Sequence, residues 1–600
     1  MGRYLKRGGT RKKGPIVSKV LLQGNEAVAQ GAWEAGCTIG VGYPGTPSTE
    51  TLEHFATLPD VYAEWCPNEK VALEVAMGAS LGGRRTLVTM KHVGLNVAAD
   101  PLFSIAYTGV NAGLVLLVAD DPGIYSSQNE QDSRNYAAAS RVPMLEPSDS
   151  ADAREMAIKA YEISERFDVP CLIRSSVRIS HTRTVLETGE RRVPERKPYS
   201  KDMLKYVMMP AGARLRRIEA DKREAALTEF AETTDLNRTE LRDRSLGIIC
   251  GGADYQHVRE ALPEASTLKI GMSWPLPPKK IAEFASQVDR LYVVEECFDY
   301  YKLRVKALGV EVSEPPACPL PPNGELTPGI IMKSFGKALP TPRATDQEVP
   351  NRPPALCAGC PHRLVMAELR RAHATVMGDI GCYTLGALPP LSALDTTVDM
   401  GASISMVHGM ELAGGIEKHP TFGVIGDSTF AHSGITSLLD IVYNQGTGNV
   451  CILDNRTTAM TGQQGNPVNG VTLQHRPSHE LDLPGLVRAL GVEDVVEADP
   501  MDLSQVRGAI QHAIDEPRLT VIIFRSPCAL LSKHREPALM VDPTVCTGCG
   551  VCISIGCQAL GRDRETGKAK IDPAACIGCT QCAQVCTFNA IVNPRGSVAK

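Results

Sequence analysis

The sequence lacks any apolar run of about 18 residues, the length that crosses a membrane, and so predicts no membrane-spanning helix. Its hydrophobic content of 43% and charged content of 22% are those of an ordinary globular protein. The net charge of −5 argues against nucleic acid as the main partner. Six of the first thirteen residues are basic and none is acidic, but no apolar segment of the secretory type follows them. We therefore expect residues 1–18 to form a basic, flexible tail.

Cysteine is abundant, with nineteen residues in a chain of 600 that shows no secretory signal. This combination indicates metal ligation in a reducing, cytoplasmic compartment rather than a disulfide framework. Two matched runs near the C-terminus each begin C-x-x-C-x-x-C and add a fourth cysteine. They are Cys546, Cys549, Cys552 and Cys557, then Cys576, Cys579, Cys582 and Cys586. Four thiolates match the four corner irons of a cubane cluster.

In two-cluster ferredoxins the fourth cysteine of each run binds the cluster of the other run. We therefore assign one [4Fe–4S] cluster to Cys546, Cys549, Cys552 and Cys586, and the second to Cys576, Cys579, Cys582 and Cys557. Zinc is one alternative, but zinc sites usually use two C-x-x-C pairs rather than triplets. Disulfides are another, but they would not need two copies of one spacing. Gln558 and Thr587 replace the usual proline after each fourth cysteine, which leaves the local turns and cluster potentials open.

Apolar runs alternate with helical stretches in two long parts of the chain, the pattern of doubly wound α/β domains. In the first, over residues 15–180, a strand at Val20–Gln23 leads into a helix, and buried strands are expected at Thr86–Met90, Gly113–Ala119 and Val169–Arg174. In the second, over residues 356–530, strands are expected at Thr421–Ile425, Val450–Leu453 and Leu519–Phe524.

Three shorter segments connect or follow the first long part. A charged helix is expected over Ala211–Arg244. A smaller α/β part covers residues 246–335, with strands at Leu246–Cys250, Thr267–Ile270 and Leu291–Glu295. Several prolines then mark an extended linker over residues 338–355.

A short motif follows the strand expected at Thr421–Ile425. Gly426-Asp427-Ser428 ends that strand, and Asn455 lies 28 residues after Asp427, at the end of the next strand. Gly426 lets the backbone approach a diphosphate, while Asp427, the Asn455 side chain and the Thr457 carbonyl could supply oxygen ligands to Mg²⁺. The pattern resembles the thiamine diphosphate motif, although Ser428 stands at a position that is commonly glycine. Taken alone, the tripeptide could also be a capped helix start.

Longer motifs make the resemblance specific, and they occur in order along the chain. They are Tyr43–Ser48, Asn68–Ala72, Met90–Asn96, Ser126–Arg134, Gly378–Tyr383, Ile425–Phe430 and Asp454–Gly462. Together they are similar to the α subunit of indolepyruvate:ferredoxin oxidoreductases, from about residue 19 to about residue 595. What the resemblance implies is oxidative decarboxylation of 2-oxo acids to acyl-CoA and CO₂, with thiamine diphosphate, Mg²⁺, coenzyme A and ferredoxin.

The resemblance also implies an α/β architecture with two doubly wound domains that bind thiamine diphosphate, a transketolase-C-like α/β domain and a C-terminal α+β two-cluster ferredoxin domain. The expected order is a pyrimidine-binding domain at 19–182, a charged connector at 183–245, the transketolase-C-like domain at 246–337, the linker at 338–355, a diphosphate-binding domain at 356–532 and the ferredoxin domain at 538–600. A small β subunit and at least two copies of this chain are expected, because thiamine often binds between protomers in this superfamily.

Four residues of the first part receive catalytic hypotheses from the resemblance. Glu69 matches the glutamate that hydrogen-bonds the aminopyrimidine and so promotes loss of the thiazolium proton. Thr46 matches a threonine near the substrate, although it could equally be a turn residue. His92 could position the substrate, but a lone histidine after a strand is more often structural. Arg134 could pair with the substrate carboxylate in bidentate fashion or remain a solvated loop residue.

A third cluster is suggested by four further cysteines, which are Cys357, Cys360, Cys382 and Cys528. Their order resembles that of the proximal [4Fe–4S] cluster of 2-oxo-acid:ferredoxin oxidoreductases. Such a cluster would accept electrons before the ferredoxin domain does. The alternatives are a zinc site, unrelated buried thiols, or replacement of one thiolate by His362.

Competing functions remain open at the level of sequence. The enzyme could act on another 2-oxo acid, such as pyruvate, a branched-chain oxo acid or phenylglyoxylate. An electron-transfer subunit with a decayed thiamine site is a different class, which the presence of Glu69, Asp427 and Asn455 argues against.

Overall fold

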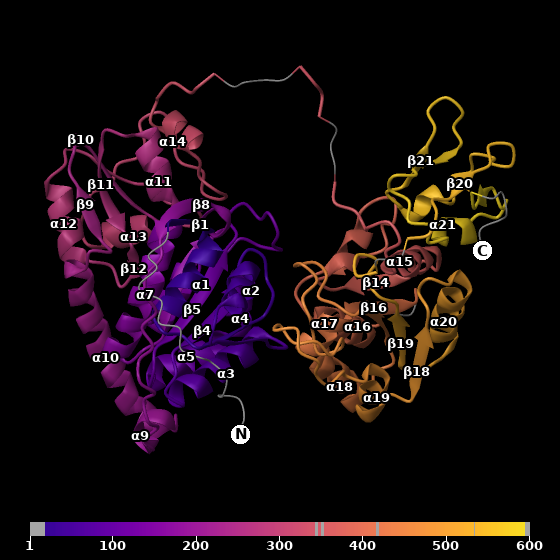
Figure 1. Ribbon diagram of the computed structural model, residues 1–600, viewed down its shortest axis with the longest axis horizontal. Helices are drawn as coiled ribbons and strands as arrows, with labels where there is room; N and C mark the ends of the chain where they lie inside the picture. Colours follow the sequence, from indigo (N-terminus) through magenta and orange to yellow (C-terminus); the bar gives the residue numbers. More distant parts are fainter. Residues whose placement is uncertain (1–18, 342–345, 350–352, 416–418, 533–534, 595–600) are drawn as a thin grey trace, which may run out of the picture. The chain divides into compact units, whose positions relative to one another are not determined.

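The computed structural model describes residues 19–341, 346–349, 353–415, 419–532 and 535–594 (Figure 1). The predicted basic tail at 1–18 lies outside the described residues. The chain divides into two compact units, Met1–Arg343 and Ala344–Lys600. The boundary between them falls within the proline-rich stretch that the sequence marks as a linker.

The N-terminal unit is built on a seven-stranded sheet in the order β12-β6-β7-β5-β4-β2-β3, parallel except for β12. The strands are β2 (Ile39–Gly42), β3 (Tyr62–Trp65), β4 (Thr86–Lys91), β5 (Leu114–Asp120), β6 (Met144–Leu145), β7 (Cys171–Ser176) and β12 (Met272–Trp274). Every residue of β4, β5 and β7 is buried, as their continuous apolar sequences predict. Helix α1 (Gly24–Glu34) packs on α7 (Ser150–Phe167), and α3 (Glu69–Leu81) packs on α5 (Ala99–Thr108).

The strand expected at Val20–Gln23 forms, but not in this sheet. It is β1 (Lys19–Gln23), which pairs antiparallel with β8 (Arg183–Glu187) in a separate two-stranded ribbon. Its residues alternate between exposed and partly buried, so it lacks the full burial of the central strands. Residues 183–187 therefore pack with the first domain rather than with the connector that follows.

The helix of the connector is shorter than its sequence predicts, because α10 covers only Pro210–Thr233. The side-chain amide of Asn237 donates to the carbonyl of Ala231, and its oxygen accepts from the amides of Gly271 and Met272. These bonds turn the chain into the second sheet, ordered β13-β10-β11-β9. Its strands are β9 (Arg238–Glu240), β10 (Asp243–Gly251), β11 (Ala265–Ile270) and β13 (Leu291–Val293), followed by α13 (Tyr300–Ala307).

The C-terminal unit has a parallel six-stranded sheet in the order β15-β14-β16-β17-β19-β18. The strands are β14 (Thr375–Gly378), β15 (Thr396–Thr397), β16 (Thr421–Gly426), β17 (Asn449–Asp454), β18 (Asp494–Ala498) and β19 (Thr520–Arg525). Helices α15 (His362–Arg371) and α20 (Leu503–Asp515) pack together beside it. Parallel strands place their C-terminal ends at one edge, where the motif at Gly426 lies.

The cysteine-rich tail belongs to the same unit and shares its core. It contains two antiparallel pairs, β20 (Met540–Val541) with β23 (Ile591–Val592) and β21 (Leu560–Arg562) with β22 (Ala569–Ile571), and the short helix α21 (Gln581–Gln584). One buried cluster runs from Leu364 of α15 and Phe422 of β16 to Ile555 and Val585 of the tail. The Gln558 side chain, in place of the usual proline, donates to the carbonyl of Ala355 at 3.1 Å and so ties the tail to the start of the unit.

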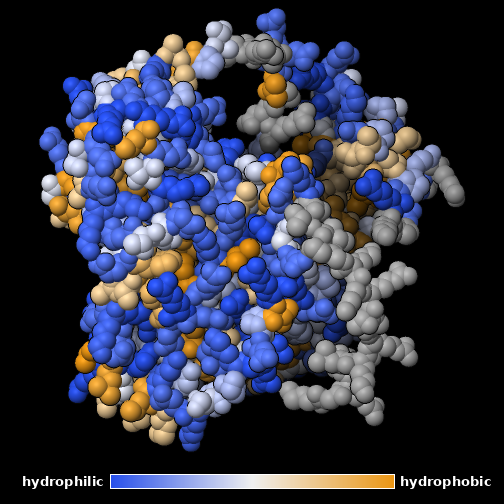
Figure 2. Space-filling model, turned by 60° about the vertical axis from the view of Figure 1, so that its left-hand side comes forward, coloured by the Kyte–Doolittle hydropathy of each residue, from blue (hydrophilic) through white to orange (hydrophobic). Residues whose placement is uncertain are grey.

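Figure 2 shows one face of the surface. Hydrophilic residues dominate that face, and its hydrophobic residues are gathered in small groups. Within the described ranges, none of the helices combines the length and the apolar character needed to cross a membrane.

Candidate active site and electron-transfer centres

Asp427 is the first residue after β16, and its carboxylate is almost fully buried. Its Oδ1 accepts from the amide of Ser428 at 2.7 Å, whereas Oδ2 has no hydrogen-bond partner. Burial, and then the nearby carboxylate of Asp454, raise the pKa of Asp427 to about 8. A buried carboxylate oxygen without a partner is costly, and a bound cation would remove that cost.

Asn455 lies beside this carboxylate, at the end of the neighbouring strand β17. Its Oδ1 accepts from the amide of Thr457 at 3.1 Å, and its Nδ2 lies 3.2 Å from Nε2 of His362. Burial lowers the pKa of His362 to about 4, so the ring is neutral and can accept from this amide. Asp427 and Asn455 thus present the hard oxygen atoms that Mg²⁺ prefers, and the residues fit a magnesium-bound diphosphate.

Glu69 lies in the N-terminal unit, as the first residue of α3, and is buried. Asn68 caps the helix, because its side chain accepts from the amide of Val71 at 2.9 Å. Gly94, in α4 (His92–Val97), lies so close that a Cβ atom there would be 2.5 Å from Oε1 of Glu69. Glycine at this position therefore leaves room for the Glu69 carboxylate.

A second polar group lies at the C-terminal end of β4. His92 is buried, neither ring nitrogen has a hydrogen-bond partner, and burial lowers its pKa. The neighbouring Lys91 donates to the carbonyl of Ser126 at 2.6 Å, and its Nζ lies 4.0 Å from Asp121. Burial lowers the pKa of Lys91 to about 8, an effect that Asp121 opposes. The hydroxyl of Ser126 in turn lies 3.4 Å from the carbonyl of the half-buried Thr46.

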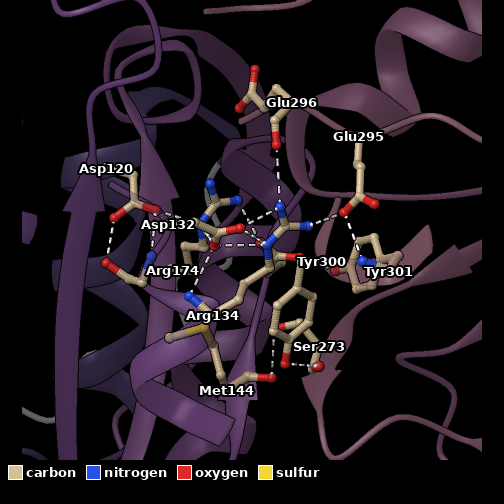
Figure 3. A network of polar contacts seen from close by, with 12 residues as sticks. Asp120, Asp132, Arg134, Met144, Arg174, Ser273, Glu295, Glu296, Tyr300 and Tyr301 are labelled. Atoms are coloured by element: carbon tan, nitrogen blue, oxygen red, sulfur yellow. Dashed lines mark hydrogen bonds and ion pairs between the residues drawn. The ribbon is translucent and has the colours of Figure 1, made fainter. Parts of the chain in front are cut away.

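Arg134 does not lie in a solvated loop, which corrects one expectation from the sequence. It is 2% exposed, and its guanidinium donates to Asp132, to Glu295 and to the carbonyl of Glu296 (Figure 3). The rings of Tyr300 and Tyr301 lie 4.8 and 4.7 Å from it. These groups occupy all three of its nitrogens, so the geometry argues against a bidentate contact with a substrate carboxylate.

The same network joins the two sheets of the N-terminal unit. Arg174 of β7 pairs with Asp120 of β5 and with Glu146, both at 2.6 Å. Glu295 follows β13 of the second sheet, and burial raises its pKa to about 7. Strand β12 pairs with β6 next to these residues. Arg134 therefore holds the junction between the sheets.

The eight cysteines of the tail line two small cavities. The first is lined by Cys546, Cys549, Cys552 and Cys586, and the second by Cys557, Cys576, Cys579 and Cys582. The fourth cysteine of each run thus lies with the first three of the other. Cys549 is exposed, so the first cavity lies at the surface.

Cys357, Cys360, Cys382 and Cys528 form a third group of neighbouring thiols. Burial, and then the neighbouring Cys528 and Cys357, raise the pKa of Cys382 to about 11. Burial also raises the pKa of Cys360, and Cys382 and Cys357 act in the same direction on it. The group adjoins the residues at Asp427, because the amide of Cys528 donates to the carbonyl of Asn455 at 3.0 Å. His362 bonds to Asn455 and so is directed away from the role of a cluster ligand.

The spacing of these thiols does not suit zinc. Four sulfur ligands about 2.3 Å from one zinc ion would lie roughly 3.8 Å apart. Among the described residues, the only group of three or more candidate metal ligands within 4.8 Å of one another is Asp494, His512 and Glu516, which contains no cysteine. Wider spacing suits a cubane, in which each thiolate binds a different iron.

Comparisons with known proteins agree with this arrangement. Residues 30–232 match the family described as "Pyruvate flavodoxin/ferredoxin oxidoreductase, thiamine diP-bdg", residues 379–524 match "Thiamine pyrophosphate enzyme, C-terminal TPP binding domain", and residues 569–592 match "4Fe-4S binding domain". The chain is 38% identical to "Indolepyruvate oxidoreductase subunit IorA" of Archaeoglobus fulgidus, over 96% of this chain and 97% of the relative. The chain belongs to the IorA family.

Two further IorA relatives show similar coverage. The protein of Methanothermobacter marburgensis is 39% identical over 96% of this chain and 98% of its own length, and that of Pyrococcus horikoshii is 37% identical over 96% and 97%. Membership of the family confirms the predicted fold class, the thiamine diphosphate cofactor, the iron–sulfur clusters and the thiamine-dependent oxidoreductase type. The relatives are named as a subunit, which indicates that members of the family work with a partner chain.

Two contributors to the site, Lys91 and Asp121, were missed at the level of sequence, and His362 was considered only as a possible cluster ligand. Lys91 lies inside the Met90–Asn96 motif, but its burial and its partners, like those of His362, depend on tertiary structure. Asp121 follows β5 and accepts from the amide of Ser126 at 2.8 Å, which folds the 121–127 loop over Lys91. The apolar run that ends in two aspartates was the only local signal for this loop.

Proposed function

We propose that this chain is the catalytic subunit of an arylpyruvate oxidoreductase of the indolepyruvate type, which forms acyl-CoA and CO₂ and passes electrons to ferredoxin. The proposal is carried by the buried Oδ2 of Asp427, which has no hydrogen-bond partner. Asn455 follows the neighbouring strand, and its carbonyl accepts from the amide of Cys528 in the third cysteine group. Asp427, Asn455 and Thr457 would hold Mg²⁺ and the diphosphate. Thiamine diphosphate, when bound, supplies the electron sink for decarboxylation.

The N-terminal unit would supply the groups for cofactor activation and substrate binding. Glu69 would hold a proton at the aminopyrimidine ring, in the space that Gly94 leaves open. Arg134 is committed to its network. Lys91 is the buried cation beside Ser126 and Asp121 at the end of β4, and we assign the substrate carboxylate to it. Thr46 and His92, at the same edge of the sheet, would contact the carbonyl end of the substrate.

The cysteine groups would form a path for single electrons through the C-terminal unit. The 357–360 loop packs against the second cavity of the tail, since a Cβ atom on Gly359 would lie 3.5 Å from that of Cys579. Cys582 of the second cavity and Cys552 of the first are close enough for one thiol to raise the pKa of the other. Electrons would pass from the Cys357 group to the second cavity and then to the first, where the exposed Cys549 faces an external ferredoxin.

Domains and partners follow from the same proposal. The pyrimidine-binding, transketolase-C-like, diphosphate-binding and ferredoxin domains would occupy the ranges given from the sequence. A small β subunit, ferredoxin, coenzyme A and a second copy of this chain would complete the enzyme, because thiamine often binds between protomers in this superfamily.

The proposal is tested by adding 2-oxo acids and coenzyme A to the complete enzyme without oxygen, while the iron–sulfur absorbance and acyl-CoA are followed. We expect indolepyruvate to bleach the clusters and to give a higher kcat/KM than pyruvate or 2-oxoglutarate. Lys91→Met should raise KM, and Glu69→Ala should abolish bleaching. Bleaching that persists in Glu69→Ala, or a preference for a non-aromatic 2-oxo acid, would contradict the proposal.

A further inference from the structure

Arg363 is a fully buried arginine in the second position of α15, three residues after Cys360. Its Nη1 donates to the carbonyl of Ile555 at 3.0 Å, and its Nη2 donates to the carbonyls of Leu356 and Cys357 at 2.9 and 2.6 Å. The Nε group has no partner. One side chain thus binds both the segment that carries Cys357 and Cys360 of the third cysteine group and the tail that carries the other two groups.

The charge of Arg363 has no carboxylate to balance it within the described part of the chain. All its partners are backbone carbonyls, and no acidic side chain lies within ion-pair distance of it among the described residues. Arg134 is buried to a similar degree, but it pairs with Asp132 and Glu295. A buried charge normally needs a counter-charge, so a group other than a carboxylate must supply the negative charge that balances Arg363.

Two cysteine thiols, those of Cys360 and Cys579, lie close enough to Arg363 for its charge to act on them. Burial raises the pKa of both Cys360 and Cys579, and the charge of Arg363 acts in the opposite direction on each. These two residues belong to different groups, the third group and the second cavity of the tail, which touch at Gly359. A cubane held by four thiolates is anionic and becomes more so when it is reduced, so the clusters themselves can supply the counter-charge.

We propose that Arg363 is a positioning residue for electron transfer, which raises the reduction potentials of the two clusters on either side of it and fixes the loops that carry them. The inference rests on the proposed function, because it needs clusters in both groups. Cluster potentials depend on net charge and hydrogen bonding nearby, and a fixed cation favours the form that holds the extra electron. Arg363 is linked to the segment near the surface cavity only through the carbonyl of Ile555. The reduction potential of the cluster in that cavity should therefore be the least affected.

The test is a redox titration of the anaerobically purified enzyme, followed by electron paramagnetic resonance. Arg363→Gln keeps donors for the carbonyls but removes the charge, whereas Arg363→Lys keeps the charge. Arg371→Gln is the matched control, since Arg371 ends the same helix with its side chain 57% exposed. We expect Arg363→Gln to weaken reduction of two of three clusters at least tenfold, which is about 59 mV for one electron. Arg363→Lys and Arg371→Gln should stay near the wild-type potentials.

Unchanged potentials in Arg363→Gln at wild-type iron content would overturn the inference. Equal shifts in Arg363→Gln and Arg363→Lys would also overturn it, because hydrogen-bond geometry rather than charge would then set the potentials. If Arg363→Gln does not retain its clusters, Arg363→Lys decides, and a tenfold shift in that variant counts against the charge. Wild-type enzyme without cluster signals would instead refute the proposed function, so the two failures are distinguishable.

Discussion

Asp427 combines burial with an unpartnered oxygen, and its protonation should therefore govern the stability of the metal-free protein. Its pKa lies at about 8, above the ordinary 3.8, so between these values the folded chain holds a proton that the unfolded chain has released. Stability must then fall as pH rises through this window, by at most about 1.4 kcal/mol per pH unit. Asp427→Asn removes this dependence.

The measurement is thermal unfolding of chelator-treated protein between pH 5 and pH 9. We expect Asp427→Asn to be more stable than wild type above pH 7, and to be inactive. Mg²⁺ with thiamine diphosphate should stabilise wild type alone. Parallel pH curves for the two proteins would show that Asp427 is not a protonated, buried group in the metal-free state.

Gly94 offers a test of Glu69 that leaves the carboxylate itself in place. In Gly94→Ala the new Cβ atom would meet Oε1 of Glu69 at 2.5 Å and displace it. We expect activity to fall at least about a hundredfold, since misplacement of a catalytic group by about 1 Å can cost that much. Gly78→Ala is the control, because it lies on the same helix as Glu69 with no atom within 4 Å of its Cβ. It should be fully active, and loss of activity in both variants would contradict the role of Glu69.

At the scale of elements, the junction between β5, β7 and α13 depends on Arg134. Arg134→Met would leave Glu295 buried without its cation and Asp132 with only Arg174 at 3.8 Å, which should cost about 3–5 kcal/mol in the free energy of unfolding. Denaturant unfolding measures this loss, and KM for the 2-oxo acid should change little in protein that remains folded. A large rise in KM at unchanged stability would restore the substrate-binding role.

Elements were predictable where local sequence decides their structure. The buried strands β4, β5 and β7 read as continuous apolar runs, and their boundaries agree within about two residues with the expectation. The end of α10 was not predictable, because the Asn237 bonds that stop it come from residues 34 and 35 positions away. Strand β12 is three residues long and gains its register from β6. The same distinction holds for the candidate site. The cysteine groups of the tail were predictable from their local spacing, whereas the burial of Arg134 and Lys91 depends on tertiary contacts and was not.

At the scale of the whole molecule, the C-terminal unit concentrates the electron path in one body. The sheet that presents Asp427 and the tail share a hydrophobic core, so the three cysteine groups keep fixed separations. The N-terminal unit carries Glu69 and Lys91 and forms a separate compact body. Under the proposed function, substrate recognition would belong to the N-terminal unit and electron transfer to the C-terminal unit.

The most direct measurement is iron and acid-labile sulfide per chain, in anaerobically purified wild type and in Cys382→Ser. Three cubanes predict about twelve irons in wild type. The loss of the third cluster predicts about eight in Cys382→Ser, together with loss of 2-oxo-acid oxidation. About eight irons in both proteins, with activity retained in Cys382→Ser, would contradict a path through the Cys357 group.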